Sequence, residues 1–88
     1  MIRVLVVDDH AVVRRGITSL LAAADGLECV GSAGDGDSAL ELVEQLDPDV
    51  LLLDLSMPGR DGVTVIRTLR EQGRTTPVLV LTSFGEPD

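Results

Sequence analysis

The stretch LLLDLSMPG, residues 51–59, runs from three leucines directly into a carboxylate and then into a turn. A short, unbroken apolar run is typical of a strand that is covered on both faces, as in a parallel sheet. Asp54 ends this run, at a point where removing a charge from water costs free energy unless a partner compensates it. The stretch therefore predicts a buried strand over 50–54 that presents a functional carboxylate at its carboxyl end.

Three other apolar runs predict further strands, at residues 2–7 (IRVLVV), 27–33 (LECVGSA) and 77–83 (PVLVLTS). Between the four runs, apolar residues recur at helical spacing. The alternation of strand and helix with short connections predicts an α/β fold, in which a parallel sheet of four strands carries three helices on its two faces.

The three helices are predicted from their apolar positions and their end signals. The first lies within residues 10–25, and its apolar stripe consists of Val13, Ile17, Leu20, Leu21 and Ala24. The second follows the turn at 34–37, where Asp35 or Asp37 is suited to cap it, and it ends before Pro48. The third follows the loop after Asp54 and ends near Gly73.

Composition limits the classes of function. The 88 residues suffice for one domain, and the net charge of −8 opposes binding of the chain alone to DNA or to an anionic membrane. The single Cys29 cannot form an internal disulfide and is predicted to pack as a small apolar residue. No apolar run reaches the length of a membrane span, so we expect a cytoplasmic protein.

Acidic residues end two of the predicted strands, and a hydroxyl residue ends a third. Asp8 and Asp9 follow the first strand, Asp54 ends the third and Thr82 ends the fourth. In an open parallel sheet the ligand site lies at the carboxyl ends of the strands. If the first and third strands are neighbours, three carboxylates meet there, and their repulsion favours a bound divalent cation of the Mg²⁺ type.

A simpler interpretation treats these acids as solvated caps of the helices that follow. It accounts for any one of them, and Asp9 in particular could cap the first helix. It accounts less well for two successive acids together with Asp54, which has apolar neighbours on both sides. A shared cation site explains all three.

The segments VLVVDDHAVVRRG (4–16), LLLDLSMPGRDG (51–62) and PVLVLTS (77–83) resemble the phospho-receiver domain of bacterial response regulators. The likeness is strongest to the branch whose members carry a LuxR/NarL-type helix-turn-helix. It implies a flavodoxin-like (receiver) sheet in which Asp54 accepts a phosphoryl group from a sensor histidine kinase. It further implies that Asp8, Asp9, Asp54 and the Ser56 backbone carbonyl bind Mg²⁺, and that Thr82 is the switch hydroxyl.

Receivers of this family have five strand-helix units, whereas this chain contains four strands and three helices by the patterns above. We therefore expect residues 1–88 to form a partial receiver domain, with the DNA-binding output domain not present. The family's lysine at the end of the fifth strand is also missing, since the chain has no lysine. An apolar fourth strand at a sheet edge predicts a homo-oligomer or an element-swapped dimer.

Other functions fit less well, and we expect no enzyme. A haloacid-dehalogenase-type phosphohydrolase would need an aspartate at position 56, which is serine. The glycines of GSAGDG (31–36) do not match a dinucleotide or P-loop fingerprint, and the same stretch fails as an EF-hand loop because Ala39 and Leu40 stand where an oxygen ligand and a glycine belong. His10 is predicted to be merely exposed. The alternative that stays open is a self-associating fragment that takes up no phosphoryl group.

Overall fold

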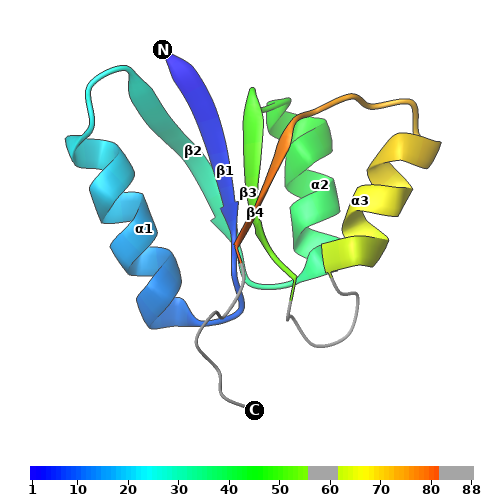
Figure 1. Cartoon of the computed structure of the whole chain (residues 1–88), viewed down its shortest axis with the longest axis horizontal. Helices are drawn as coiled ribbons and strands as arrows, with labels where there is room; N and C mark the ends of the chain where they lie inside the picture. The colour runs from blue at the N-terminus through cyan, green and yellow to red at the C-terminus, as the bar shows by residue number, and fades with distance from the viewer. Residues whose placement is uncertain (56–61, 82–88) are drawn as a thin grey trace.

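The computed structural model describes residues 1–55 and 62–81. The elements, in chain order, are β1 (Ile2–Val7), α1 (Ala11–Ala23), β2 (Leu27–Ala33), α2 (Gly36–Leu46), β3 (Val50–Asp54), α3 (Gly62–Glu71) and β4 (Val78–Leu81) (Figure 1). The predicted alternation of strands and helices is confirmed. Within the described ranges, no helix combines the length and the apolar character needed to cross a membrane.

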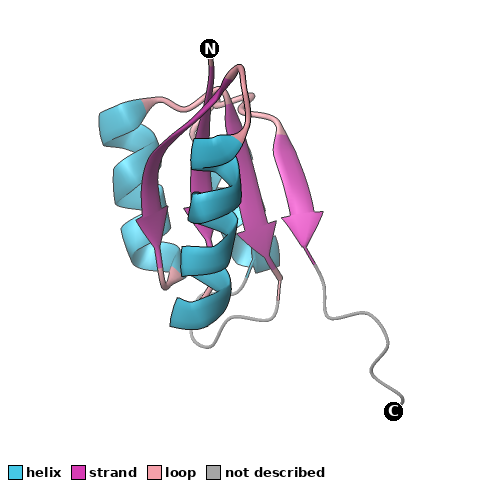
Figure 2. Cartoon of the chain, turned by 90° about the vertical axis from the view of Figure 1, so that its left-hand side faces the viewer, coloured by secondary structure: helices cyan, strands magenta, loops and turns pink. Residues whose placement is uncertain are grey.

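The four strands form one parallel sheet in the order β2-β1-β3-β4 (Figure 2). Helix α1 covers one face, and α2 and α3 cover the other (Figure 1). This arrangement confirms the predicted α/β sheet with helices on both faces. It also makes β1 and β3 direct neighbours, so their carboxyl ends lie side by side.

The core is uneven between the two faces of the sheet. The larger cluster lies on the face of α2 and α3, and its buried members are Leu5, Val7, Ala33, Ala39, Val43, Leu51, Leu53, Val65 and Leu69. The cluster on the α1 face has three buried members, Val4, Val6 and Leu21. Alternate residues of β1 serve opposite clusters, which explains why its sequence is apolar throughout rather than alternating.

The predicted apolar stripe of α1 is wrong at two positions. Val13 is 45% exposed and Leu20 is 73% exposed, whereas Leu21 is buried. The reason is that α1 is the only described helix on its face and packs mainly against β2 and β1. Leu21 and Ile17 pack in the cluster on this face, whereas Val13 and Leu20 stay exposed. Beside α1 lies an apolar groove of about 420 Å³, lined by Ile2, Val4, Leu21, Leu27, Val50, Leu52 and Leu79.

Three further local predictions concern the starts of α1 and α2 and the packing of Cys29. The N-cap residue of α1 is His10 rather than Asp9, and in the described structure the His10 side chain makes no capping hydrogen bond. Asp35 does cap α2, because its carboxylate accepts a hydrogen bond from the Ser38 backbone N–H at 2.8 Å. Cys29 is half-buried and donates its thiol proton to the Gly31 carbonyl oxygen at 3.4 Å.

The Asp35 cap predicts a pH-dependent contribution to stability. Hydrogen bonds from the Ser38 backbone N–H and hydroxyl hold the pKa of Asp35 below its ordinary value. A depressed carboxyl pKa stabilises the fold above the unfolded pKa, and the stabilisation is lost as the pH falls through the folded pKa. Asp35→Ala should therefore lower the melting temperature at neutral pH, with a deficit that shrinks under acid.

Thermal unfolding at neutral and acidic pH measures this difference. Glu44→Gln is the matched control, since it removes an exposed carboxylate from the same helix without touching the cap. A deficit for Asp35→Ala that stays constant with pH would contradict the assignment.

Candidate functional site

The acidic residues at the carboxyl ends of β1 and β3 form one cluster. The parallel register pairs Val7 with Leu53, so the residues that follow them, Asp8 and Asp54, emerge next to each other. Both are buried, each with 5% of its surface exposed. One ligand atom from each of Asp8, Asp9, His10 and Asp54 lies within 4.8 Å of all the others. The predicted meeting of three carboxylates is therefore observed.

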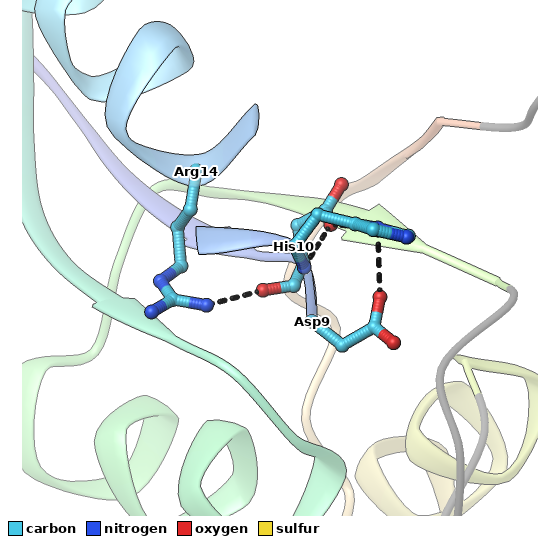
Figure 3. A network of polar contacts seen from close by, with 4 residues as sticks. Asp9, His10 and Arg14 are labelled. Atoms are coloured by element: carbon cyan, nitrogen blue, oxygen red, sulfur yellow. Dashed lines mark hydrogen bonds and ion pairs between the residues drawn. The ribbon is translucent and has the colours of Figure 1, made fainter. Parts of the chain in front are cut away.

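His10 lies over the acid pair and contacts both of its members (Figure 3). Its Nδ1 donates to Asp8 Oδ1 at 3.0 Å and lies 3.0 Å from Asp9 Oδ1. Its backbone N–H donates to the same Asp8 oxygen at 2.8 Å. The hydrogen bond with Asp8 and the charge of Asp9 raise the pKa of His10 above its ordinary value.

Arg14, in the first turn of α1, contacts the backbone of the same acid pair (Figure 3). Its Nη1 donates to the Asp8 backbone carbonyl oxygen at 2.7 Å. The guanidinium passes over Gly34, where an added Cβ would lie 3.0 Å from Nη1. Arg14 therefore links α1 to the backbone of the acid pair and lies close to the turn after β2.

The donor set fits a hard divalent cation. Asp9 Oδ1 is buried and finds no hydrogen-bond partner among the described residues. A buried carboxylate oxygen without a hydrogen-bond partner is costly, and a cation would satisfy it. Oxygen ligands from several carboxylates are those that Mg²⁺ binds in proteins. Asp8, Asp9 and Asp54 would hold the ion.

The other two predicted site residues lie outside the described residues. Ser56, whose backbone carbonyl is the expected fourth ligand, and Thr82, the expected switch hydroxyl, both fall there. The sequence patterns missed two contributors to the site, His10, which belongs to the cluster, and Arg14, which binds the Asp8 backbone. The sequence did carry a signal for them, since His10 directly follows the acid pair and Arg14 lies one helical turn further along.

Gly62 allows the start of α3 to pass close to the chain that leaves Asp54. An added Cβ at Gly62 would lie 2.6 Å from Leu55 Cδ2, 2.8 Å from Leu55 Cα and 3.0 Å from the Asp54 carbonyl oxygen. Two of these three atoms belong to the backbone, so the contact cannot be relieved by a side-chain rotation alone. The position therefore couples α3 to the backbone of the acidic cluster.

Gly62→Ala should lower the free energy of unfolding by about 1–3 kcal/mol, the usual range for overpacking. Gly16→Ala is the matched control, because a Cβ there meets no atom within 4 Å and alanine favours a helix over glycine by about 0.5–1 kcal/mol. Urea unfolding followed by circular dichroism measures both changes. Equal stabilities for Gly62→Ala and the unchanged chain would contradict the steric argument.

Comparison with known proteins identifies a family that has this arrangement. The family described as "Response regulator receiver domain" matches residues 4–88. The chain is 46% identical over 80 residues to the nitrate/nitrite response regulator protein NarP of Escherichia coli, covering 91% of this chain and 37% of NarP. It is 53% identical over 85 residues to a protein-glutamate methylesterase/protein-glutamine glutaminase of Myxococcus xanthus, covering 97% of this chain and 24% of that protein.

Solved structures agree with the sequence matches. The signal receiver domain of the response regulator NarL from Mycobacterium tuberculosis superimposes with a TM-score of 0.89 at 42% identity, covering 98% of this chain and 69% of that one. The response regulator domain of Thermotoga maritima CheB gives a TM-score of 0.86 at 32% identity, covering 99% of this chain and 64% of that one. The chain thus spans well under half the length of the two curated relatives named above.

Proposed function

Since this chain belongs to the family of response regulator receiver domains, we propose that it accepts a phosphoryl group on Asp54, with a divalent cation held by Asp8, Asp9 and Asp54. The observation that carries the proposal is the cluster itself, which gathers three carboxylates at the carboxyl edge of the sheet. Asp54 ends a strand in which Leu51 and Leu53 are buried on the α2 and α3 face. This packing holds Asp54, which is itself 5% exposed, at the carboxyl edge of the sheet beside Asp8.

In this proposal Asp54 is the nucleophile. One of its carboxylate oxygens forms a bond to phosphorus while the bond between phosphorus and the donor's leaving group breaks, so the phosphoryl group moves without a change of oxidation state. A bound Mg²⁺ would supply positive charge to offset the negative charge on the transferring oxygens. Asp8, Asp9 and Asp54 would hold that ion, and Arg14 positions the backbone of Asp8.

The remaining predicted roles belong to the same proposal. The Ser56 carbonyl would complete the protein ligands of Mg²⁺, and the Thr82 hydroxyl would respond to the phosphorylated Asp54. The receiver resemblance supports both assignments. Neither residue lies in the described part of the chain.

The proposed phosphodonor is a sensor histidine kinase, since receiver domains of response regulators take phosphoryl groups from such kinases. We propose that residues 1–88 are part of a receiver domain that, in its parent, controls a helix-turn-helix regulator of transcription. Relatives named as transcriptional regulatory proteins, such as LiaR of Bacillus subtilis at 41% identity, support this output. The methylesterase relative shows that closely similar receivers also occur in proteins named for an enzymatic activity. A cytoplasmic location remains part of the proposal.

We also propose self-association through β4. It is the last strand of the described sheet, and two of its apolar side chains are open to solvent, with Leu79 57% and Val80 38% exposed. An apolar edge strand favours pairing with a second copy of the same chain. Size-exclusion chromatography with light scattering should show a dimer or larger species. An ordered monomer at high concentration would refute this part.

The phosphoryl-acceptor proposal is tested with a small phosphodonor and Mg²⁺, read by intact mass. We expect one phosphate-sized mass increase per chain and its loss when a chelator removes the cation. If phosphoryl uptake is the same with and without the chelator, the proposed requirement for a bound cation is wrong. No uptake with Mg²⁺ present would favour the fragment that only self-associates.

A further inference from the structure

We propose that His10 is a metal ligand, and that it makes the acidic cluster a site for a divalent first-row transition metal such as Mn²⁺, Co²⁺ or Zn²⁺. The inference rests on the proposed function in one respect, since it uses the same cation site. The inference goes beyond the proposed function because it names a different kind of ion and adds the His10 imidazole nitrogen to the ligands of that ion.

The distances around His10 Nδ1 match those between ligands of one metal ion. Neighbouring ligands about 2.1 Å from an octahedral ion lie about 3.0 Å apart, and opposite ligands lie about 4.2 Å apart. Nδ1 lies 3.0 Å from Asp8 Oδ1 and 3.0 Å from Asp9 Oδ1. Since all four donor atoms lie within 4.8 Å of one another, movements of about half an ångström bring the set around one ion.

The local chain geometry holds the ring in this place. The Asp8 carboxylate accepts the His10 backbone N–H at 2.8 Å, which folds the His10 main chain back over the acid pair. Asp9 Oδ1, the buried oxygen with no hydrogen-bond partner among the described residues, is one of the two oxygens that Nδ1 faces. The imidazole and this buried carboxylate oxygen therefore face the same small space.

The chemistry of the donors distinguishes two kinds of ion. Mg²⁺ prefers oxygen ligands and retains waters, so it gains little from an imidazole. Mn²⁺, Co²⁺ and Zn²⁺ bind imidazole nitrogen together with carboxylates, with affinities that generally rise along the series from Mn²⁺ to Co²⁺. In the transition-metal complex, Nδ1 loses its proton to water and donates its lone pair to the ion. In the Mg²⁺ complex a water takes that position.

If His10 only forms hydrogen bonds, its replacement should not change the affinity for transition metals relative to that for Mg²⁺. If His10 is a metal ligand, this ratio of affinities should fall. We expect His10→Gln to weaken binding of Mn²⁺, Co²⁺ and Zn²⁺ by about tenfold or more. Loss of a residue that only hydrogen-bonds to a metal ligand already costs about tenfold or more in affinity, and loss of a ligand should cost at least as much. Mg²⁺ affinity should stay within about twofold, since no Mg²⁺ ligand is lost. The side chain is 62% exposed, so this change leaves the core intact.

The experiment is calorimetric titration of each metal alone into the 88-residue chain and its variants at one fixed pH. Glu44→Gln is the control for non-specific attraction of cations to an acidic chain, because it removes one exposed charge far along the sequence from the cluster. It should leave every affinity unchanged. Asp9→Asn should weaken all metals, Mg²⁺ included.

A second measurement needs no variant. The chain contains one histidine, so a directly bound imidazole nitrogen in the pulsed electron paramagnetic resonance spectrum of the Mn²⁺ complex can come only from His10. Labelling histidine with ¹⁵N should change that nitrogen coupling. A spectrum without imidazole coupling, or an unchanged ratio of metal affinities in His10→Gln, would overturn the proposal.

These outcomes are separable from failure of the proposed function. Mg²⁺ binding with an unaltered metal ratio in His10→Gln would overturn the role of His10 and leave the phosphoryl-acceptor proposal standing. Absence of binding by every metal would overturn both. Imidazole coordination in a chain that takes up no phosphoryl group would support the metal site and refute the acceptor.

Discussion

Asp54→Asn is expected to abolish uptake of a phosphoryl group from a small phosphodonor. The amide has no anionic oxygen to attack phosphorus, and it also removes one of the three carboxylates of the cluster. The mass increase expected of the unchanged chain should be absent at every time point, rather than be reached at a lower rate. Intact mass measured over a time course, with Mg²⁺ present, gives the result directly.

Asp35→Asn is the matched control for this experiment. It makes the same chemical change in an exposed carboxylate, and asparagine still caps a helix about as well as aspartate. Uptake should therefore persist in this variant. Phosphoryl uptake that survives in Asp54→Asn would place the nucleophile elsewhere, and fragmentation of the modified chain would locate it.

Leu5→Ala is expected to cause the largest loss of stability among single core changes in β1. Leu5 is fully buried in the strand that lies between β2 and β3, and it belongs to the larger core cluster. Truncation of a buried leucine costs about 2–5 kcal/mol, through lost burial and the cavity left behind. Since domains are stable by only about 5–15 kcal/mol, this change should remove a substantial fraction of the free energy of unfolding.

Leu20→Ala makes the same substitution at a position that is 73% exposed, and it should change stability by less than about 0.5 kcal/mol. Urea unfolding measures both variants, followed by far-ultraviolet circular dichroism because the chain has no tryptophan or tyrosine to report by fluorescence. Similar losses in the two variants would contradict the described core.

The strands and the acid cluster were predictable because their signals are local or follow from topology. Unbroken apolar runs marked the strands, and a parallel sheet brings the ends of neighbouring strands to one edge, so Asp8 and Asp54 meet once β1 lies beside β3. The exposure of Val13 and Leu20 was not predictable from α1 alone. Helical periodicity shows which residues share a face, and only the packed structure shows whether a neighbour covers it.

The part of His10 was missed for a related reason. A histidine at a helix start is usually exposed, and His10 is indeed largely exposed. What the sequence does not show is the turn in which the Asp8 carboxylate accepts the His10 backbone N–H and folds the ring over the acids. That contact depends on dihedral angles between two strand-end residues, for which no periodic pattern exists.

The uneven core has a consequence for motion. The cluster between α1 and the sheet has three buried residues, one of them Leu21 of α1 itself, whereas the cluster on the opposite face has nine. Segments with few buried contacts open at lower free energy than the global unfolding transition, and their amide hydrogens exchange with solvent first. The amides of α1 should therefore exchange before those of β1 and β3. Because His10 and Arg14 anchor the start of this helix to the acid pair, occupancy of the cluster would set how often α1 opens.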